Sequence, residues 1–175
     1  MQRRASPLSF AIKFGASFIV LFALFEMSRG SLFEKIIIGN IVLNTTAGIV
    51  NTIAPHEALY VEGRNLVSAG SNLHVTRGCE GVEMFLLLVS GIVAFPATAQ
   101  HRLRGLLMGL TLVYALTLGR LISLHFALRY SPEAWDLLHG LVLPLGPVLI
   151  VALYFLHWCG SGTYVERASR LLPAT

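Results

Sequence analysis

Long apolar stretches separated by short polar segments make up most of this chain. Four of them approach or exceed the roughly 20 residues that a helix needs to cross a bilayer core. We expect these helices at residues 8–27, 82–97, 106–128 and 137–158. The pattern therefore predicts an all-α membrane protein in which residues 1–175 form a single domain, a bundle of about four transmembrane helices.

A fifth apolar stretch, residues 31–54, is interrupted by polar side chains such as Glu34 and Asn40. Ser31 followed by Glu34 is typical of a helix N-terminus, and Pro55 marks the end of the helix. We interpret this stretch as an amphipathic helix that lies at the membrane surface or packs over the bundle, rather than as a further crossing.

Residues 55–78 are the most hydrophilic part of the chain between its ends. Residues 61–67 and 72–76 have the composition of short strands, and the turn-forming segment Ser68-Ala69-Gly70-Ser71 lies between them. This arrangement predicts a small hairpin. We expect the segment to form a polar cap outside the membrane that contacts a substrate.

The composition agrees with a membrane protein, because 55% of the residues are hydrophobic and only 13% are charged. The net charge of +4 does not come from one basic patch, so we expect membrane lipid, and no nucleic acid, as a partner. The two cysteines lie far apart in the sequence. They make neither a disulfide framework nor the paired spacing of a zinc site.

The basic residues flank the apolar stretches and indicate the topology. They are Arg3, Arg4, Lys13, Arg102, Arg104, Arg167 and Arg170. The positive-inside bias places all of them in the cytoplasm if residues 31–54 do not cross, so we expect both termini to be cytoplasmic. The first stretch also fits a secretory signal, but no small-x-small cleavage site follows it, and we interpret it as a retained anchor.

Three reactive or ionisable residues, Cys79, Arg120 and His139, lie near the ends of predicted membrane helices. The expected topology puts all three at the external leaflet. A helix N-terminus favours the thiolate of a cysteine, although a free cysteine is more commonly a small buried apolar residue. A histidine at such a boundary is likewise commonly an interfacial polar residue. Because all three residues are expected at the same membrane face, we predict that they form a functional site there.

An arginine inside a membrane helix costs about 3 kcal/mol or more at mid-bilayer unless it has a partner. Tyr114, Thr117, Arg120 and Ser123 recur at every third position and predict a polar stripe that faces the bundle interior. The alternative is that Arg120 extends alone to the lipid headgroups. We favour the interior placement, with Glu83 as a carboxylate able to form an ion pair there.

A thiol nucleophile needs a base that accepts its proton and later protonates the leaving amine, and histidine titrates in the required range. An arginine is suited to stabilising the oxyanion of the tetrahedral intermediate. In this scheme Cys79 is the nucleophile and Arg120 the oxyanion stabiliser. The base is His139 or, alternatively, His125. The backbone amides of residues 80–81 are candidates for additional oxyanion donors.

These residues lie in motifs that resemble those of the exosortase/archaeosortase family of multi-pass membrane cysteine transpeptidases, in one of its short forms. The resemblance covers residues 66–158. Its motifs are Gly78-Cys79-Glu80-Gly81, Leu118-Gly119-Arg120-Leu121 and Leu137-Leu138-His139-Gly140. In that family a cysteine, an arginine and a histidine form the proposed active site, so the resemblance assigns catalytic roles to Cys79, Arg120 and His139.

The resemblance implies that the substrates are exported proteins with a C-terminal sorting signal, which consists of a recognition motif, a transmembrane helix and a basic tail. Cleavage at the motif would leave a thioester on Cys79, which an amine or water then resolves. The resemblance also implies a Gram-negative inner membrane, with the site facing the periplasm. Supporting roles fall to Gly81 and Glu83, to Glu80, where many members have a small residue, and to Thr117, where asparagine is frequent.

Two other functions fit part of the pattern. The first is a non-enzymatic membrane subunit or assembly factor, in which Arg120 and His139 are structural or contact lipid headgroups. The second is a haem or metal protein that uses His125, His139 and His157, but the expected topology places His157 near the opposite face. We therefore predict no metal and no cofactor, and we interpret Cys159 as structural.

Overall fold

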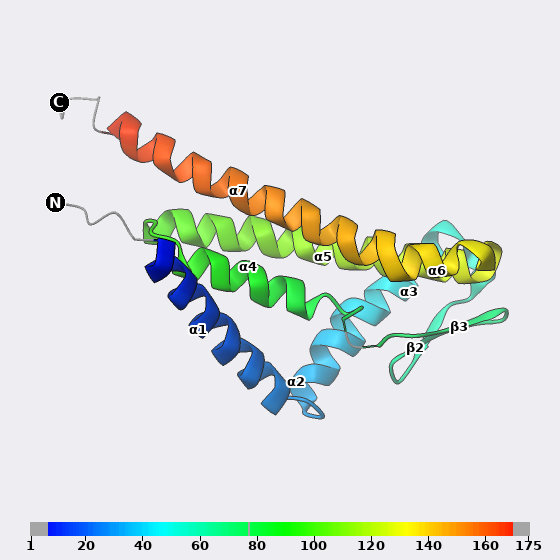
Figure 1. The fold of residues 1–175 in the computed structure, drawn as a ribbon. Helices are drawn as coiled ribbons and strands as arrows, with labels where there is room; N and C mark the ends of the chain where they lie inside the picture. Colours follow the sequence, from blue (N-terminus) through cyan, green and yellow to red (C-terminus); the bar gives the residue numbers. More distant parts are fainter. Residues whose placement is uncertain (1–6, 77, 170–175) are drawn as a thin grey trace.

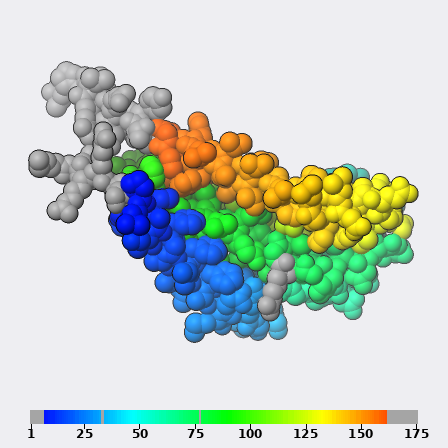
Figure 2. Space-filling view, viewed as in Figure 1, coloured from blue at the N-terminus to red at the C-terminus, as the bar shows by residue number. Residues whose placement is uncertain are grey.

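The computed structural model describes residues 7–76 and 78–169, without the side chains of residue 33 and residues 162–169. The molecule is elongated, with most helices running along its length and a small sheet at one end, called the sheet end below (Figures 1 and 2). The start of α1 and the last described turns of α7 share the opposite end. Arg3, Arg4 and Arg170, which entered the topology prediction, lie outside the described residues.

The chain begins with two helical segments that meet at an angle (Figure 1). The helix α1 (Pro7–Met27) confirms the first predicted span. After a short turn, α2 (Leu32–Glu34), the π-helix η1 (Lys35–Leu43) and α3 (Asn44–Ile53) follow one another without a break. The helix expected at residues 31–54 is therefore present, and it runs toward the sheet end.

A three-stranded antiparallel sheet follows the short 3-10 turn η2 (Pro55–Glu57). Its strands are β1 (Tyr60–Glu62), β2 (Asn65–Ser68) and β3 (Ser71–His74), in that order. The mostly helical fold agrees with the all-α prediction, and the polar segment in which a hairpin was expected forms this small sheet.

The predicted hairpin is confirmed between β2 and β3, where Ser68 pairs with Ser71. Residues 61–67, however, do not form one strand, because the chain reverses at Gly63 and Arg64 and β1 pairs with β2. Gly63 has a φ of +62°, and glycine at the first central position is typical of a tight hairpin turn. The prediction counted Glu62-Gly63-Arg64-Asn65 within one strand and therefore missed this turn.

The helix α4 (Val82–Ala94) is shorter than the span expected at residues 82–97. It stops at Phe95, whose φ and ψ of −76° and 135° are extended. Pro96 follows directly, and a residue before proline is disfavoured in the helical region. The prediction placed the end at the proline itself and therefore too late.

The helix α5 (Ala99–Tyr130) has 32 residues and begins well before the expected span at residues 106–128. Thr98 caps it, because its side chain accepts a hydrogen bond from the backbone amide of His101 at 3.3 Å. The first turns of α5 are polar, so hydropathy did not predict them as part of the helix. Its length lets α5 connect the two ends of the molecule (Figure 1).

The last predicted span, residues 137–158, is also longer in the structure. The chain passes through the 3-10 turn η3 (Pro132–Ala134), the single turn α6 (Trp135–Leu137) and the π-helical segment η4 (Leu138–Val142) before it enters α7 (Leu143–Ser169). These elements bring the chain back along α5 from the sheet end (Figure 1).

Two apolar clusters hold the elements together. The one nearer the sheet end joins α1, η1, α3, the sheet and the second half of α5, and it contains Phe25, Leu43, Val50, Leu66, Cys79 and Leu121. The other joins α4, the first half of α5 and α7 through Met84, Ile92, Val113, Val151 and Trp158. The candidate cysteine therefore belongs to the first cluster.

Among the described residues, four helices are long and apolar enough to cross a membrane: Pro7–Met27, Lys35–Ile53, Ala99–Tyr130 and Pro132–Ser161. Large apolar side chains are exposed on α1, α5 and α7, including Ile19, Met108 and Leu149. These features indicate a membrane protein. The set differs from the predicted one because Lys35–Ile53 qualifies, whereas α4 does not reach the required length.

Candidate functional site

The loop between β3 and α4 positions the candidate cysteine. It is fastened to the sheet by the Val75 amide, which donates to the Arg64 carbonyl at 2.9 Å, and it turns where the Cys79 amide donates to the Thr76 carbonyl at 3.1 Å. Gly81, with a φ of +76°, is the N-cap of α4. Cys79 is only 5% exposed, so this turn holds the thiol inside the molecule at the start of the helix.

Arg120 reaches this loop from the middle of α5. Its Nη1 donates to the Gly78 carbonyl oxygen at 2.8 Å, and its Nη2 lies 3.6 Å from the Cys79 Sγ. Arg120 is 8% exposed, so it does not extend alone to the lipid headgroups. The structure brings together the thiol and the guanidinium that the sequence predicted to meet, and Thr76 Oγ1 lies 3.6 Å from the same sulfur.

His139 lies on η4, between two residues that pack against the first cluster. Trp135 and Leu143, four residues to either side, both pack against that cluster, which contains Cys79. The imidazole stacks on Trp135 with centroids 5.1 Å apart, and its Nδ1 is buried without a hydrogen-bond partner. In the described part of the chain, no hydrogen bond or ion pair joins His139 to Cys79 or Arg120.

His125, the alternative base, faces the sheet instead of the cysteine. It is fully buried, and its two ring nitrogens lie 3.4 Å from Ser71 Oγ and 3.4 Å from Glu57 Oε2. The sequence analysis missed this arrangement, because its members come from η2, β3 and α5 and share no local motif. With both nitrogens directed to these partners, His125 fastens the sheet onto α5.

Glu57 is the buried acid at the centre of the polar cluster that also contains His125, Arg129 and Tyr130. Its carboxylate accepts a hydrogen bond from the Tyr130 hydroxyl and lies 3.7 Å from Arg129 Nε. The Tyr130 hydrogen bond, followed by the nearby charge of Arg129, lowers the pKa of Glu57. The carboxylate is therefore held in its charged form at neutral pH.

Glu80, predicted as a supporting residue, turns away from the thiol into an ion network. Its buried carboxylate bonds to Arg64 and lies 3.7 Å from Arg29 Nη1, and Arg64 also donates to Glu34 at 2.7 Å. Burial raises the pKa of Glu80, and the guanidinium of Arg64 opposes that shift. The network ties the cysteine loop to the turn after α1 and to the sheet, so it fixes the loop in place.

Of the other predicted supporting residues, Gly81 and Thr117 contact each other beside the cysteine, whereas Glu83 does not form its expected ion pair. Thr117 is buried directly against Gly81, where a Cβ would lie 2.0 Å from Thr117 Oγ1. Among the described residues, Glu83 makes no ion pair with Arg120, because the Arg120 guanidinium contacts the loop before α4 instead. The Oε2 of Glu83 is buried and has no hydrogen-bond partner there. The expected Glu83–Arg120 pair is therefore not formed.

The polar stripe expected on α5 is only partly inward. Thr117 and Arg120 are buried and Tyr114 is half-buried, but Ser123 is exposed. A three-residue step on a helix turns by about 300°, so the direction drifts by about 60° at each step. From Tyr114 to Ser123 the drift reaches about half a turn, which carries the last member to the outside.

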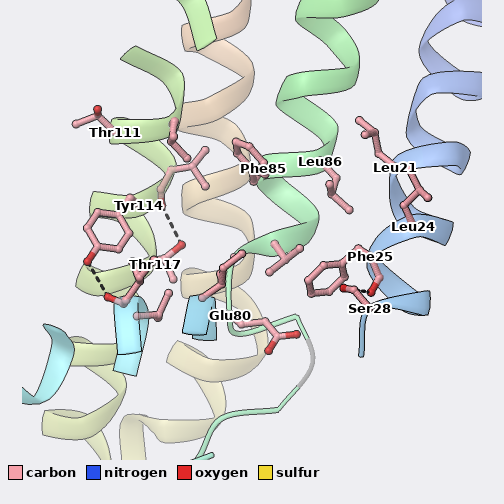
Figure 3. Close-up of a pocket in the computed structure, with 17 residues that line it drawn as sticks. Leu21, Leu24, Phe25, Ser28, Glu80, Phe85, Leu86, Thr111, Tyr114 and Thr117 are labelled. Carbon is pink, nitrogen blue, oxygen red and sulfur yellow. Dashed lines mark hydrogen bonds between the residues drawn. The ribbon is translucent and has the colours of Figure 1, made fainter. Parts of the chain in front are cut away.

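A groove of about 780 Å³ begins next to the cysteine loop, between α1, η1, α4 and α5. Figure 3 shows Leu21 and Leu24 of α1 on one side, Thr111 and Tyr114 of α5 on the other side, and Phe85 of α4 between them. At the loop it is bounded by Glu80, Gly81 and Thr117. The groove is therefore continuous with the neighbourhood of Cys79.

The described residues contain no group of three or more His, Cys, Asp or Glu side chains arranged to hold a metal ion. The nucleophile available to the site is the Cys79 sulfur, the nearest cation is Arg120, and the histidine with a free ring nitrogen on the neighbouring face is His139. This set suits covalent chemistry at a carbonyl carbon, with Arg120 stabilising negative charge.

No model of a known protein family, no curated protein and no solved structure matches the chain.

Proposed function

We propose that this protein is a membrane-embedded cysteine peptidase or transpeptidase of the exosortase type, which cleaves the C-terminal sorting signal of exported proteins. The observation that carries the proposal is the position of Arg120, whose guanidinium spans the Gly78 carbonyl and the Cys79 sulfur. An arginine inside an apolar helix is costly. Its placement against a buried thiol is explained by a role in stabilising a sulfur anion and, later, an oxyanion.

In the first step Cys79 passes its proton to His139, and the sulfur attacks the carbonyl carbon of the scissile peptide bond. Arg120 Nη2, which lies beside the sulfur, stabilises the oxyanion, and the backbone amides at the start of α4 are suited to assist. The carbon–nitrogen bond then breaks, and the leaving amine takes the proton from His139. The product of this step is a thioester on Cys79.

In the second step an amine or water attacks the thioester and gives up a proton to His139. The carbon–sulfur bond breaks, and the sulfur leaves as the thiolate, which regains the proton from His139. We assign the proton transfers to His139 rather than to His125. Both histidines have a buried ring nitrogen without a hydrogen bond, Nδ1 of His139 and Nε2 of His125, but that of His125 lies 3.4 Å from the Glu57 carboxylate and its other nitrogen contacts Ser71.

The proposed topology follows from how the helices lie side by side. The helices α4 and α7 pack against the first half of α5, and α1 packs along α4. The helix α3 and the strand β3 contact α5, whose second half shares an apolar cluster with them. Crossings by α1, α4, α5 and α7 leave both termini in the cytoplasm and place the sheet end outside. In this arrangement Cys79 faces the exterior of the inner membrane, and α3 packs over the bundle without crossing.

The test is to express the wild-type protein, Cys79→Ala and Cys159→Ala together with an exported protein that bears a C-terminal membrane helix. We expect Cys79→Ala alone to abolish cleavage and the thiol-sensitive adduct with the substrate. Cys159→Ala is the matched control, because it removes the other cysteine, which lies on α7 away from the loop. Undiminished cleavage by a correctly inserted Cys79→Ala protein would refute the proposal and favour a non-enzymatic membrane subunit.

A further inference from the structure

Most polar groups that line the groove beside the candidate site already have bonding partners within the protein. The hydroxyls along the groove are already used within the protein: Thr111 donates to the Leu107 carbonyl at 3.0 Å, and Tyr114 donates to the Ile41 carbonyl at 2.8 Å. At the loop end of the groove, Glu80 Oε2 is bonded to Arg64, and Oε1 lies 3.7 Å from Arg29 Nη1 without a hydrogen bond among the described residues. The other lining side chains are mostly apolar, so the surface fits an apolar and uncharged partner.

The depth of the groove restricts the conformation of a peptide that enters it. Two of the helices that line the groove, α1 and α5, are long and apolar enough to cross a membrane. Backbone groups at that depth must be satisfied within their own segment, so a bound peptide is helical there. Leu21 and Leu24 on α1 and Tyr114 on α5 line opposite sides of the groove (Figure 3).

We propose that this groove binds the first two turns of the substrate's own membrane helix, so that the scissile bond, just before the helix, lies at Cys79. The inference rests on the proposed function and names the surface that recognises its substrate. The lining on α5 runs from Leu110 to Thr117, a rise of about 10 Å, which is two helical turns. About the first seven residues of the substrate helix therefore determine recognition, and the following turns contact lipid.

The first test is photo-crosslinking in intact membranes. A benzophenone amino acid replaces Leu110, which lines the groove, or Met108, which is exposed on the same helix but outside the groove. The protein also carries Cys79→Ala, so that the substrate is not consumed. We expect Leu110 to crosslink to the first seven residues of the substrate helix, and Met108 not to. Equal crosslinking at both positions, or crosslinking of Leu110 to phospholipid alone, would overturn the proposal.

A second test fills the groove. Leu24→Trp places a larger side chain in it, whereas Val20→Trp, one turn earlier on α1, lies outside it. The two residues are equally exposed, at 57% each, so neither substitution disturbs the interior packing. We expect Leu24→Trp to lower the rate of substrate processing at least tenfold and Val20→Trp to leave it within twofold. Equal effects of the two variants would overturn the proposal.

The two proposals fail in different ways. Processing that requires Cys79 without a groove crosslink at Leu110 would refute helix binding and leave the chemistry intact. A groove crosslink at Leu110 in a protein whose processing ignores Cys79 would refute the chemistry and leave the binding surface intact.

Discussion

The contact between Gly81 and Thr117 gives the most direct test of the geometry at the cysteine loop. Gly81 has a φ of +76°, in the left-handed region, and a Cβ built on it would lie 2.0 Å from Thr117 Oγ1. Gly78, three residues earlier, has a φ of +84° but no atom within 4 Å of its Cβ position. The two glycines therefore share backbone strain and differ in steric space.

The expected magnitudes follow from this comparison. An L-residue in the left-handed region costs about 1–2 kcal/mol, and that is the whole expected effect of Gly78→Ala. Gly81→Ala adds an overpacking cost of about 1–3 kcal/mol, because Thr117 is buried and must move. We therefore expect Gly81→Ala to lower the free energy of unfolding by about 2–5 kcal/mol in total.

The assay is reversible unfolding in mixed detergent–lipid micelles, followed by circular dichroism, for Gly78→Ala, Gly81→Ala, Thr117→Ala and the Gly81→Ala/Thr117→Ala double variant. Thr117→Ala removes the Oγ1, although its Cβ still lies 3.1 Å from the added methyl group. The double variant should therefore regain most of the steric cost, as a coupling of about 1–3 kcal/mol. If Gly81→Ala destabilises the protein no more than Gly78→Ala, the proposed contact is wrong.

Two further substitutions test the polar groups. Arg120→Lys should slow substrate processing at least tenfold, because a single ammonium group cannot reproduce the forked contact with the loop carbonyl and the Cys79 sulfur; processing at the wild-type rate would contradict that role. Tyr130 lowers the pKa of Glu57 below its ordinary value of 4.5, so the stabilisation by the charged carboxylate is present above pH 4.5 and is lost as the pH falls through the folded-state pKa. Acid unfolding of Glu57→Gln should therefore depend less on pH than that of the wild type, whereas Glu62→Gln, at an exposed strand position, should unfold like the wild type.

The pairing of Cys79 with Arg120 could be predicted from the sequence because each residue carries its own local signal. A cysteine at a helix start and an arginine within an apolar helix both stand out against their surroundings, and the expected topology placed both at the same side of the membrane. The positions of the helices were predictable for a similar reason, since a long apolar stretch with few charges usually forms a membrane helix. Their ends were less predictable, because α5 continues through polar turns that hydropathy does not detect.

The polar clusters could not be predicted, because their members are distant in sequence. Glu57 meets His125 where the segment around the sheet packs on α5, and Glu80 meets Arg64 where the loop before α4 passes the β1–β2 turn. Nothing next to any of these residues signals its partner. The sheet was itself only partly predicted, because the turn at Gly63 interrupts a continuous strand-like pattern.

Because α4 is short, the thickness of the surrounding bilayer affects how deeply the loop that carries Cys79 lies in the membrane. The 13 residues of α4 extend about 20 Å, whereas a hydrocarbon core is about 30 Å thick. If α4 crosses as proposed, either the bilayer thins beside it or the loop that carries Cys79 lies below the headgroups. Lipids with longer chains would bury this loop more deeply, away from water and soluble amines. Lipid chain length would then control the fate of the thioester without touching any residue of the site.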